Sequence, residues 1–202
     1  LGRPGYDGIG TLELRLNGQG AALVTRGALL AEGGYEGRVE ASGAYLSAFL
    51  PGPALPFRVT GRLRASEDRI AAQDLSVEFD GGIGRAAASL QLSADPRLEL
   101  AVNMSRLDLD AWTKTLLRNN ATALPFTLDL SAETARWQRQ DLRRFKAGIA
   151  REGARLTLTD VAALFPGEAE IEARGATLGD RLELSLSFAG PNLRDSLGAF
   201  GA

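Results

Sequence analysis

Three glutamates, Glu168, Glu170 and Glu172, have the spacing and chemical type closest to a catalytic group. Paired carboxylates act as acid and base when burial separates their pKa values. Alternate residues of a strand share one face, and the residues between these glutamates are apolar, so the carboxylates are expected on the solvated side. A glycan hydrolase needs two acids that converge in a cleft. Because the acids of this chain lie on solvent-facing positions, an enzyme is the least favoured class of protein.

Two residue types are missing, histidine and cysteine. Their absence removes the usual ligands of zinc, haem and iron–sulfur clusters. It also removes Cys–His nucleophiles and Ser–His–Asp triads. We therefore expect no catalytic residue, no metal and no cofactor.

The segment 82–87 matches the dinucleotide-binding pattern G-x-G-x-x-A and follows an expected strand. A nucleotide site would need a helix immediately afterwards. The residues that follow keep a period of two instead, and Asp80-Gly81 is a strong turn signal. A hairpin turn is therefore the favoured interpretation.

Basic residues gather in one stretch: Arg136, Arg139, Arg143, Arg144, Lys146 and Arg151. The first four are candidates for contact with anionic lipid headgroups or with an acidic partner. The alternative, which we favour, is the solvated face of a strand and its turn, with the charge offset by nearby acids.

Composition limits the class of protein further. The chain has 202 residues, 45% of them hydrophobic, and a formal net charge of -2. This length is enough for one large all-β domain or two small ones, and the charge gives no reason to expect nucleic acid. No apolar stretch approaches the ~20 residues that span a bilayer. The start has neither an initiator Met nor a signal-peptide pattern, so a fragment of a longer protein is expected.

Apolar and polar residues alternate along most of the chain, which is typical of antiparallel strands with one apolar face. The predicted fold is mainly β, a twisted antiparallel sheet of tandem β-meander repeats that forms a groove or an open sandwich. Helical spacing occurs at 108–119 and 192–200, and short helical turns are conceivable at 45–50 and 160–165. The expected apolar stripe consists of Phe57, Val59, Leu75, Val77, Phe79, Leu90, Leu98, Leu100, Val102, Phe126, Leu128, Leu130, Ile171, Leu182, Leu184 and Leu186.

An internal repeat organises these elements. Leu-Pro-Phe at 55 and 124, Asp-Leu at 74 and 141, and Arg-Leu-Glu-Leu at 97 and 181 occur in the same order. The pattern predicts a first repeat at 55–123 closed by helix 108–119, and a second at 124–202 closed by helix 192–200. The third landmark is offset further, which suggests an insertion near 155–166. Segment 1–54 is expected to be a glycine-rich β segment, and one interpretation is that it is a partial repeat.

The strand Asp-Leu-Ser-Val-Glu-Phe at 74–79, the glycine turn, Pro-Arg-Leu-Glu-Leu at 96–100 and Leu-Asp-Leu-Asp-Ala-Trp at 107–112 resemble the C-terminal region of AsmA-like proteins. That family belongs to the repeating β-groove, bridge-like lipid transfer proteins of Gram-negative bacteria. The resemblance covers about residues 55–202. It implies a periplasmic location, an inner-membrane anchor on the full-length protein, and phospholipid acyl chains held in an apolar groove. Phospholipid and further repeats or the anchor of the parent chain are the implied partners.

A sealed core is the alternative to a lipid groove. A one-faced sheet must bury its apolar side against a second sheet, helices or a hydrocarbon ligand. If the core is sealed, the chain is a structural or interaction module of envelope biogenesis whose edge strands bind a partner.

Overall fold

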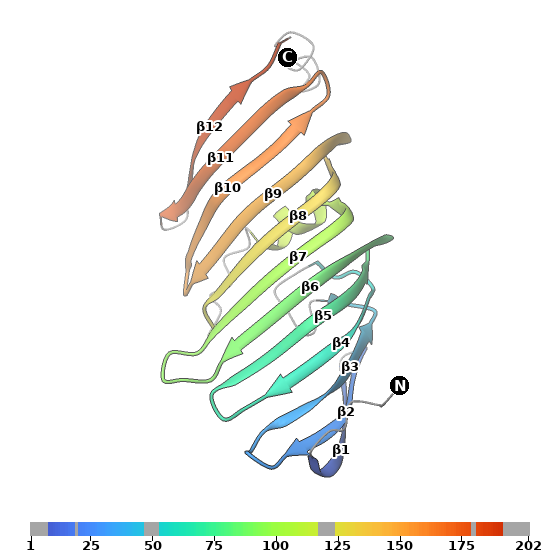
Figure 1. The fold of residues 1–202 in the computed structure, drawn as a ribbon. Helices are drawn as coiled ribbons and strands as arrows, with labels where there is room; N and C mark the ends of the chain where they lie inside the picture. Colours follow the sequence, from blue (N-terminus) through green and yellow to red (C-terminus); the bar gives the residue numbers. More distant parts are fainter. Residues whose placement is uncertain (1–7, 19, 47–52, 117–123, 179–180, 192–202) are drawn as a thin grey trace.

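The fold is one open, twisted sheet of twelve strands whose spatial order follows the sequence (Figure 1). The computed structural model describes residues 8–18, 20–46, 53–116, 124–178 and 181–191. This arrangement confirms the predicted mainly antiparallel β fold with a short helix. The strands are β1 Gly8–Gly18, β2 Ala21–Leu30, β3 Tyr35–Gly43, β4 Phe57–Ala65, β5 Arg69–Phe79, β6 Gly82–Gln91, β7 Arg97–Asp108, β8 Phe126–Trp137, β9 Gln140–Glu152, β10 Arg155–Phe165, β11 Ala169–Leu178 and β12 Arg181–Ala189.

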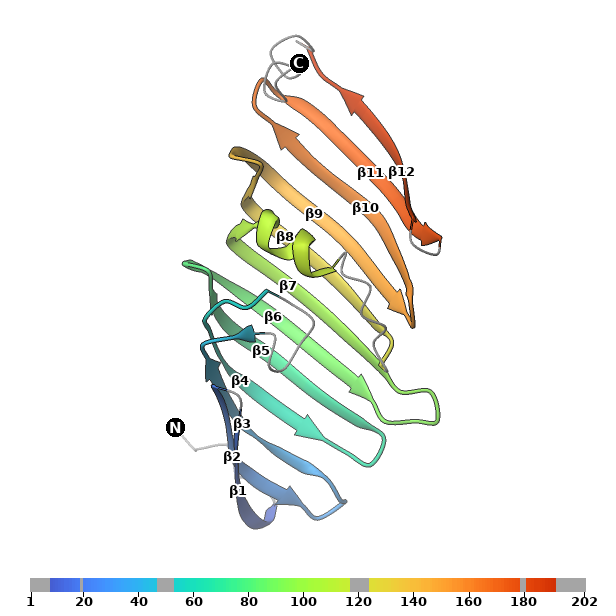
Figure 2. The same ribbon diagram turned by 180° about the vertical axis from the view of Figure 1, so that it is seen from behind.

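One junction breaks the meander. Neighbouring strands are antiparallel throughout except for β7 and β8, which are parallel. A parallel pair needs a connection that returns along the strands, because a tight hairpin reverses direction. The connection contains the helix α1 Leu109–Leu116, which lies across one face of the sheet at this junction (Figure 2).

Helix α1 begins where the sequence predicts it. The Asp108 side chain accepts hydrogen bonds from the backbone N–H groups of Asp110 (2.9 Å) and Ala111 (3.4 Å), so it caps the helix N-terminus. Its apolar residues Leu109 and Trp112 are buried in the core. The rest of the expected helix 108–119, and the whole of 192–200, lie outside the described residues.

The helical turn considered at 160–165 is wrong, because these residues form the second half of β10. Asp160 has a positive φ of 50°, and the pairing register of β10 shifts at this point against both neighbours. Such a bulge inserts one extra residue into the strand and interrupts the alternation of faces. The expected turn at 45–50 lies mostly outside the described residues.

The turn between β5 and β6 confirms the hairpin interpretation of 82–87. Asp80 and Gly81 have φ values of 51° and 71°, as a two-residue type I′ turn requires, and β5 and β6 pair antiparallel. Residues 82–87 lie in a strand, whereas a nucleotide-binding loop would lead into a helix.

The directions of the strands suggest repeat units different from those that the Leu-Pro-Phe landmarks suggest. Those landmarks match β4 with β8, and the two strands run in opposite directions. Five-strand units, β3–β7 and β8–β12, match strands of equal direction instead. Equivalent strands then begin 83 to 91 positions apart, and residues 155–165 are an ordinary member, β10. Direction therefore favours five-strand units over the division at 55–123 and 124–202.

Candidate binding face

Each of the twelve strands contributes apolar or glycine residues to one common face of the sheet. Directly paired residues of neighbouring strands project to the same side, so the pairing register traces rows across the sheet. One such row crosses from edge to edge without a polar side chain: Leu12, Gly27, Gly37, Leu63, Ala72, Ala88, Leu100, Leu128, Ile149, Leu158, Gly175 and Leu184. We call this surface the apolar face.

All sixteen residues of the expected stripe lie on this face, but their burial differs. Phe57, Leu75, Phe79, Phe126, Leu128 and Leu130 are buried. Val59, Val77, Leu98, Leu100, Val102 and Ile171 are half-buried and pack against the core cluster. Leu90 and Leu182 are half-buried, and Leu184 and Leu186 are exposed.

Burial is deepest in the middle of the sheet and falls toward its two edges. Leu107 on β7 is 1% exposed, whereas Leu186 on β12 is 68% exposed. The opposite edge strand β1 presents three exposed leucines, Leu12, Leu14 and Leu16. The expected stripe omitted them, although their alternation with polar residues between 11 and 17 was a usable signal.

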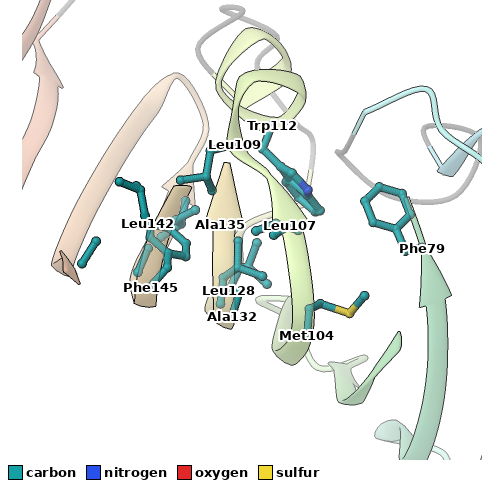
Figure 3. Packing of buried hydrophobic residues seen from close by; sticks show 14 of the residues in the cluster. Phe79, Met104, Leu107, Leu109, Trp112, Leu128, Ala132, Ala135, Leu142 and Phe145 are labelled. Carbon is teal, nitrogen blue, oxygen red and sulfur yellow. The ribbon is translucent and has the colours of Figure 1, made fainter. Parts of the chain in front are cut away.

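Two segments cover part of the apolar face near the C-terminal end of β7. Trp112 of α1 meets Phe79 of β5 edge to face, with ring centroids 5.9 Å apart, and lies near Leu107 (Figure 3). The connection between β3 and β4 contributes Leu46 and Leu55, which pack against the same cluster. In the described part of the chain, no second sheet covers this face.

Polar groups on the apolar face were not anticipated. The hydroxyls of Thr25 and Tyr35 are 2.7 Å apart and buried, and Thr25 also donates to the carbonyl of Arg38 at 3.0 Å. Arg151 is 5% exposed and pairs in register with Phe126 and Leu156. The period of two, counted from Ile149, would have placed Arg151 on this side.

The opposite, solvated face carries the other candidates. Arg136, Arg139, Arg143 and Arg144 are exposed at one end of β8 and β9, and Arg143 forms an ion pair with Glu168. Glu170 and Glu172 are exposed on β11 as expected, whereas Glu168 is exposed in the turn that precedes this strand. The structure thus disperses the basic cluster: four arginines lie on the surface and Arg151 lies on the apolar face.

A hollow of about 520 Å³ also lies on the solvated face. It is shallow and collects charges of both signs, and its polar lining includes Asp74, Arg85, Asn103, Asp129, Lys146 and Asp160. Mixed charges around an open hollow do not hold a hydrocarbon. The hollow is therefore separate from the apolar face.

Among the described residues, one carboxyl, that of Asp80, has a clearly raised pKa. Burial raises the pKa of Asp80 above its ordinary value, and the nearby charge of Asp108 adds to the effect. Asp80 lies in the hairpin turn beside the start of α1, so its charge is unfavourable to the fold at this point.

The fold and the face together define a single-layer, open β-sheet protein with a continuous apolar side. Comparison of the chain with protein-family models, with curated proteins and with solved structures finds no match. Among the described residues, no cluster of acidic side chains has the grouping that would hold a metal ion. No helix in the same residues is long and apolar enough to cross a bilayer.

Proposed function

We propose that the chain binds phospholipid acyl chains along its apolar face and forms a segment of a lipid-transfer protein. The observation that carries the proposal is the apolar row that crosses all twelve strands, over which the described residues form a cover at one end of the strands. Each methylene group that such a face shields from water contributes ~0.8 kcal/mol. Binding of this kind needs no catalytic group.

The sequence resemblance to AsmA-like proteins adds the cellular setting of the proposal. The parent protein would be tethered to the inner membrane, and this segment would lie in the periplasm. Lipids would partition into the groove while their headgroups stay in water, and gradients or partners would set the direction of transfer. The surface arginines Arg136, Arg139, Arg143 and Arg144 are exposed on the solvated side, and in this proposal they would contact anionic headgroups or an acidic partner.

The second candidate is a structural module with a filled core. Deep burial in the middle of the sheet supports it, because Met104, Leu107 and Leu156 are each about 1% exposed. In that case the half-buried residues around Leu100 pack only against one another, and hydrocarbon finds no space there.

Native mass spectrometry of the purified chain, with extraction and identification of bound lipid, separates the two candidates. Lipid binding predicts co-purifying phospholipid and uptake of a fluorescent phospholipid from vesicles of phosphatidylethanolamine and phosphatidylglycerol. A folded, lipid-free chain that takes up none would overturn the proposal and leave the structural module.

A matched pair of variants on β7 locates the site. Leu100→Asp places a charge on the apolar face and should abolish uptake, whereas Asn103→Asp places the same charge on the solvated face, opposite Arg85 and Ser131, and should leave it unchanged. Circular dichroism confirms that both variants are folded. If Leu100→Asp does not fold, the exposed pair Leu184→Asp and Ser185→Asp on β12 provides the same comparison.

A further inference from the structure

Among the described residues, the two edge strands carry little of the usual protection against pairing, and the one register irregularity of β1 is confined to Gly8–Gly10. In the described part of the chain, β1 and β12 each have one paired neighbour, so each presents an open edge. Natural edge strands are commonly blunted by proline, by inward-pointing charges or by short length. Neither β1, with 11 residues, nor β12, with nine, contains proline, and their charged side chains lie on the solvated face.

Both edge strands resemble the two strands that meet at the internal parallel junction. β12 and β7 begin with the same four residues, Arg-Leu-Glu-Leu, at 181–184 and 97–100. β1 contains Thr-Leu-Glu-Leu at 11–14, and β8 contains Thr-Leu-Asp-Leu at 127–130. By these four-residue matches, the β7·β8 junction pairs a strand that begins like β12 with a strand that resembles β1, although strand order places β8 at the position of β3.

Strand direction permits the same pairing between two copies. Ten antiparallel pairs and one parallel pair separate β1 from β12, so the two edge strands run in the same direction. They lie at opposite ends of the open sheet, which keeps them from meeting within one copy (Figure 1). A second copy related by a translation and a rotation that continues the sheet twist would place its β1 parallel to β12 of the first.

We infer that β12 of one copy docks in parallel onto β1 of a second copy, in the register of the β7·β8 junction. That junction pairs Leu100 with Leu128 and Val102 with Leu130. The corresponding contacts are Leu184 with Leu12 and Leu186 with Leu14 of the second copy. These four leucines are 42% to 68% exposed in a single copy. Docking buries them and joins the two apolar faces into one.

The solvated side of the inferred contact contains no like-charge clash. In the same register Glu183 faces Thr11, Ser185 faces Glu13, and Ser187 faces Arg15. Like charges directly opposite each other destabilise a strand pair, and none occurs among these three. The contact is heterologous, so it extends into an open array rather than closing as a two-fold dimer.

Site-specific disulfide formation tests the register, because the chain has no cysteine of its own. Two exposed positions that should face each other are changed in separate proteins, Thr11→Cys in one and Glu183→Cys in the other. After mixing and mild oxidation, the cross-linked heterodimer should dominate over either homodimer on a non-reducing gel. Directly paired residues satisfy the short Cα separation that a disulfide needs.

The matched control is Asn17→Cys mixed with Glu183→Cys. Asn17 lies on the same face of β1 but six residues further along, roughly 20 Å away at 3.3 Å per residue, so cross-linking should fall at least tenfold. Equal cross-linking of the two mixtures would overturn the inferred register. Preferential self-cross-linking of Glu183→Cys, or a wild-type chain that stays monomeric at every concentration in light scattering, would overturn the docking.

Discussion

Asp74 and Asp160 occupy the same position in two different strands, 86 residues apart in the sequence. Each is the sixth residue of its strand, β5 or β10, and each has a φ of 50°. Each also lies where the pairing register shifts against both neighbouring strands. Bulges bend and twist a strand locally, so the equivalent strands of the two five-strand units carry the same local bend.

The bulge conformation predicts a specific sensitivity to side-chain shape. A left-handed backbone costs a residue other than glycine about 1–2 kcal/mol, with aspartate and asparagine the best tolerated. Asp74→Val should therefore lower the free energy of unfolding by ~1–2 kcal/mol, and Asp74→Gly should be nearly neutral. Urea unfolding measures both. Ser76→Val, two residues along the same strand, is the control and should change little; an equal loss in the two valine variants would contradict the prediction.

Because burial differs between the middle and the edge of the apolar face, leucine substitutions at the two places should differ in their effect on stability. Leu107 is 1% exposed and Leu184 is 46% exposed. Leu107→Ala should lower the free energy of unfolding by about 2–5 kcal/mol, since it opens a cavity, whereas Leu184→Ala should cost less than about 1 kcal/mol. Chemical denaturation of the two variants checks this, and similar losses would show that the edge is as well packed as the centre.

Helix α1 packs Trp112 onto the apolar face, so substitutions in this region should lower the free energy of unfolding by different amounts. Trp112→Ala removes the ring that meets Phe79 and should cost about 3–5 kcal/mol. Trp112→Phe should cost much less, because the buried indole N–H has no hydrogen-bond partner among the described residues and its removal is favourable. Asp108→Ala should cost ~1 kcal/mol through loss of the helix cap. Urea unfolding ranks the three, and a Phe variant as damaged as the Ala variant would contradict this order.

Asp80 predicts a pH dependence of stability. Its pKa is raised in the fold, first by burial and then by the charge of Asp108, so the folded chain binds a proton more tightly than the unfolded chain. The fold is therefore favoured at this site below the unfolded pKa, and that advantage is lost as pH rises through the folded pKa. Asp80→Asn removes the charge and suits the Asn-Gly turn, so it should raise the melting temperature at pH 7 and have little effect near pH 3.

Asp68 supplies the control of opposite sign for this pH experiment. A hydrogen bond from Ser66 lowers the pKa of Asp68, so its stabilising effect exists above the unfolded pKa and is lost as pH falls through the folded pKa. Asp68→Asn should leave the melting temperature unchanged or slightly lower at pH 7. A rise like that of Asp80→Asn would mean that general charge reduction causes both effects.

Alternation of side chains was sufficient to predict the strands and the shared apolar face, because a period of two is a local property of the backbone. Thus Leu98, Leu100 and Val102 are on one side of β7, as predicted. The helix after Leu107 was predictable for a similar reason, since the Asp108 cap and Trp112 lie within one short segment.

Features that depend on distant partners were not accessible in this way. Strand direction depends on the β7·β8 crossover, so the Leu-Pro-Phe landmarks matched strands that run in opposite directions. The bulge at Asp160 shifts the alternation, so Val161, Leu164 and Phe165 imitated helical spacing. Arg151 was assigned to a solvated cluster by its charge, although its place in the period puts it on the apolar face.

The odd number of strands in each unit has a consequence for how such a protein could grow. After five strands and one crossover, the first strand of the next unit runs in the same direction and has its apolar residues on the same side of the sheet. Gene duplication or deletion of whole units would therefore keep the apolar residues of every unit on the same side of the sheet. With an even number of strands per unit, the strand direction would be reversed in each successive unit. With five strands per unit, the length of the apolar face increases in proportion to the number of units.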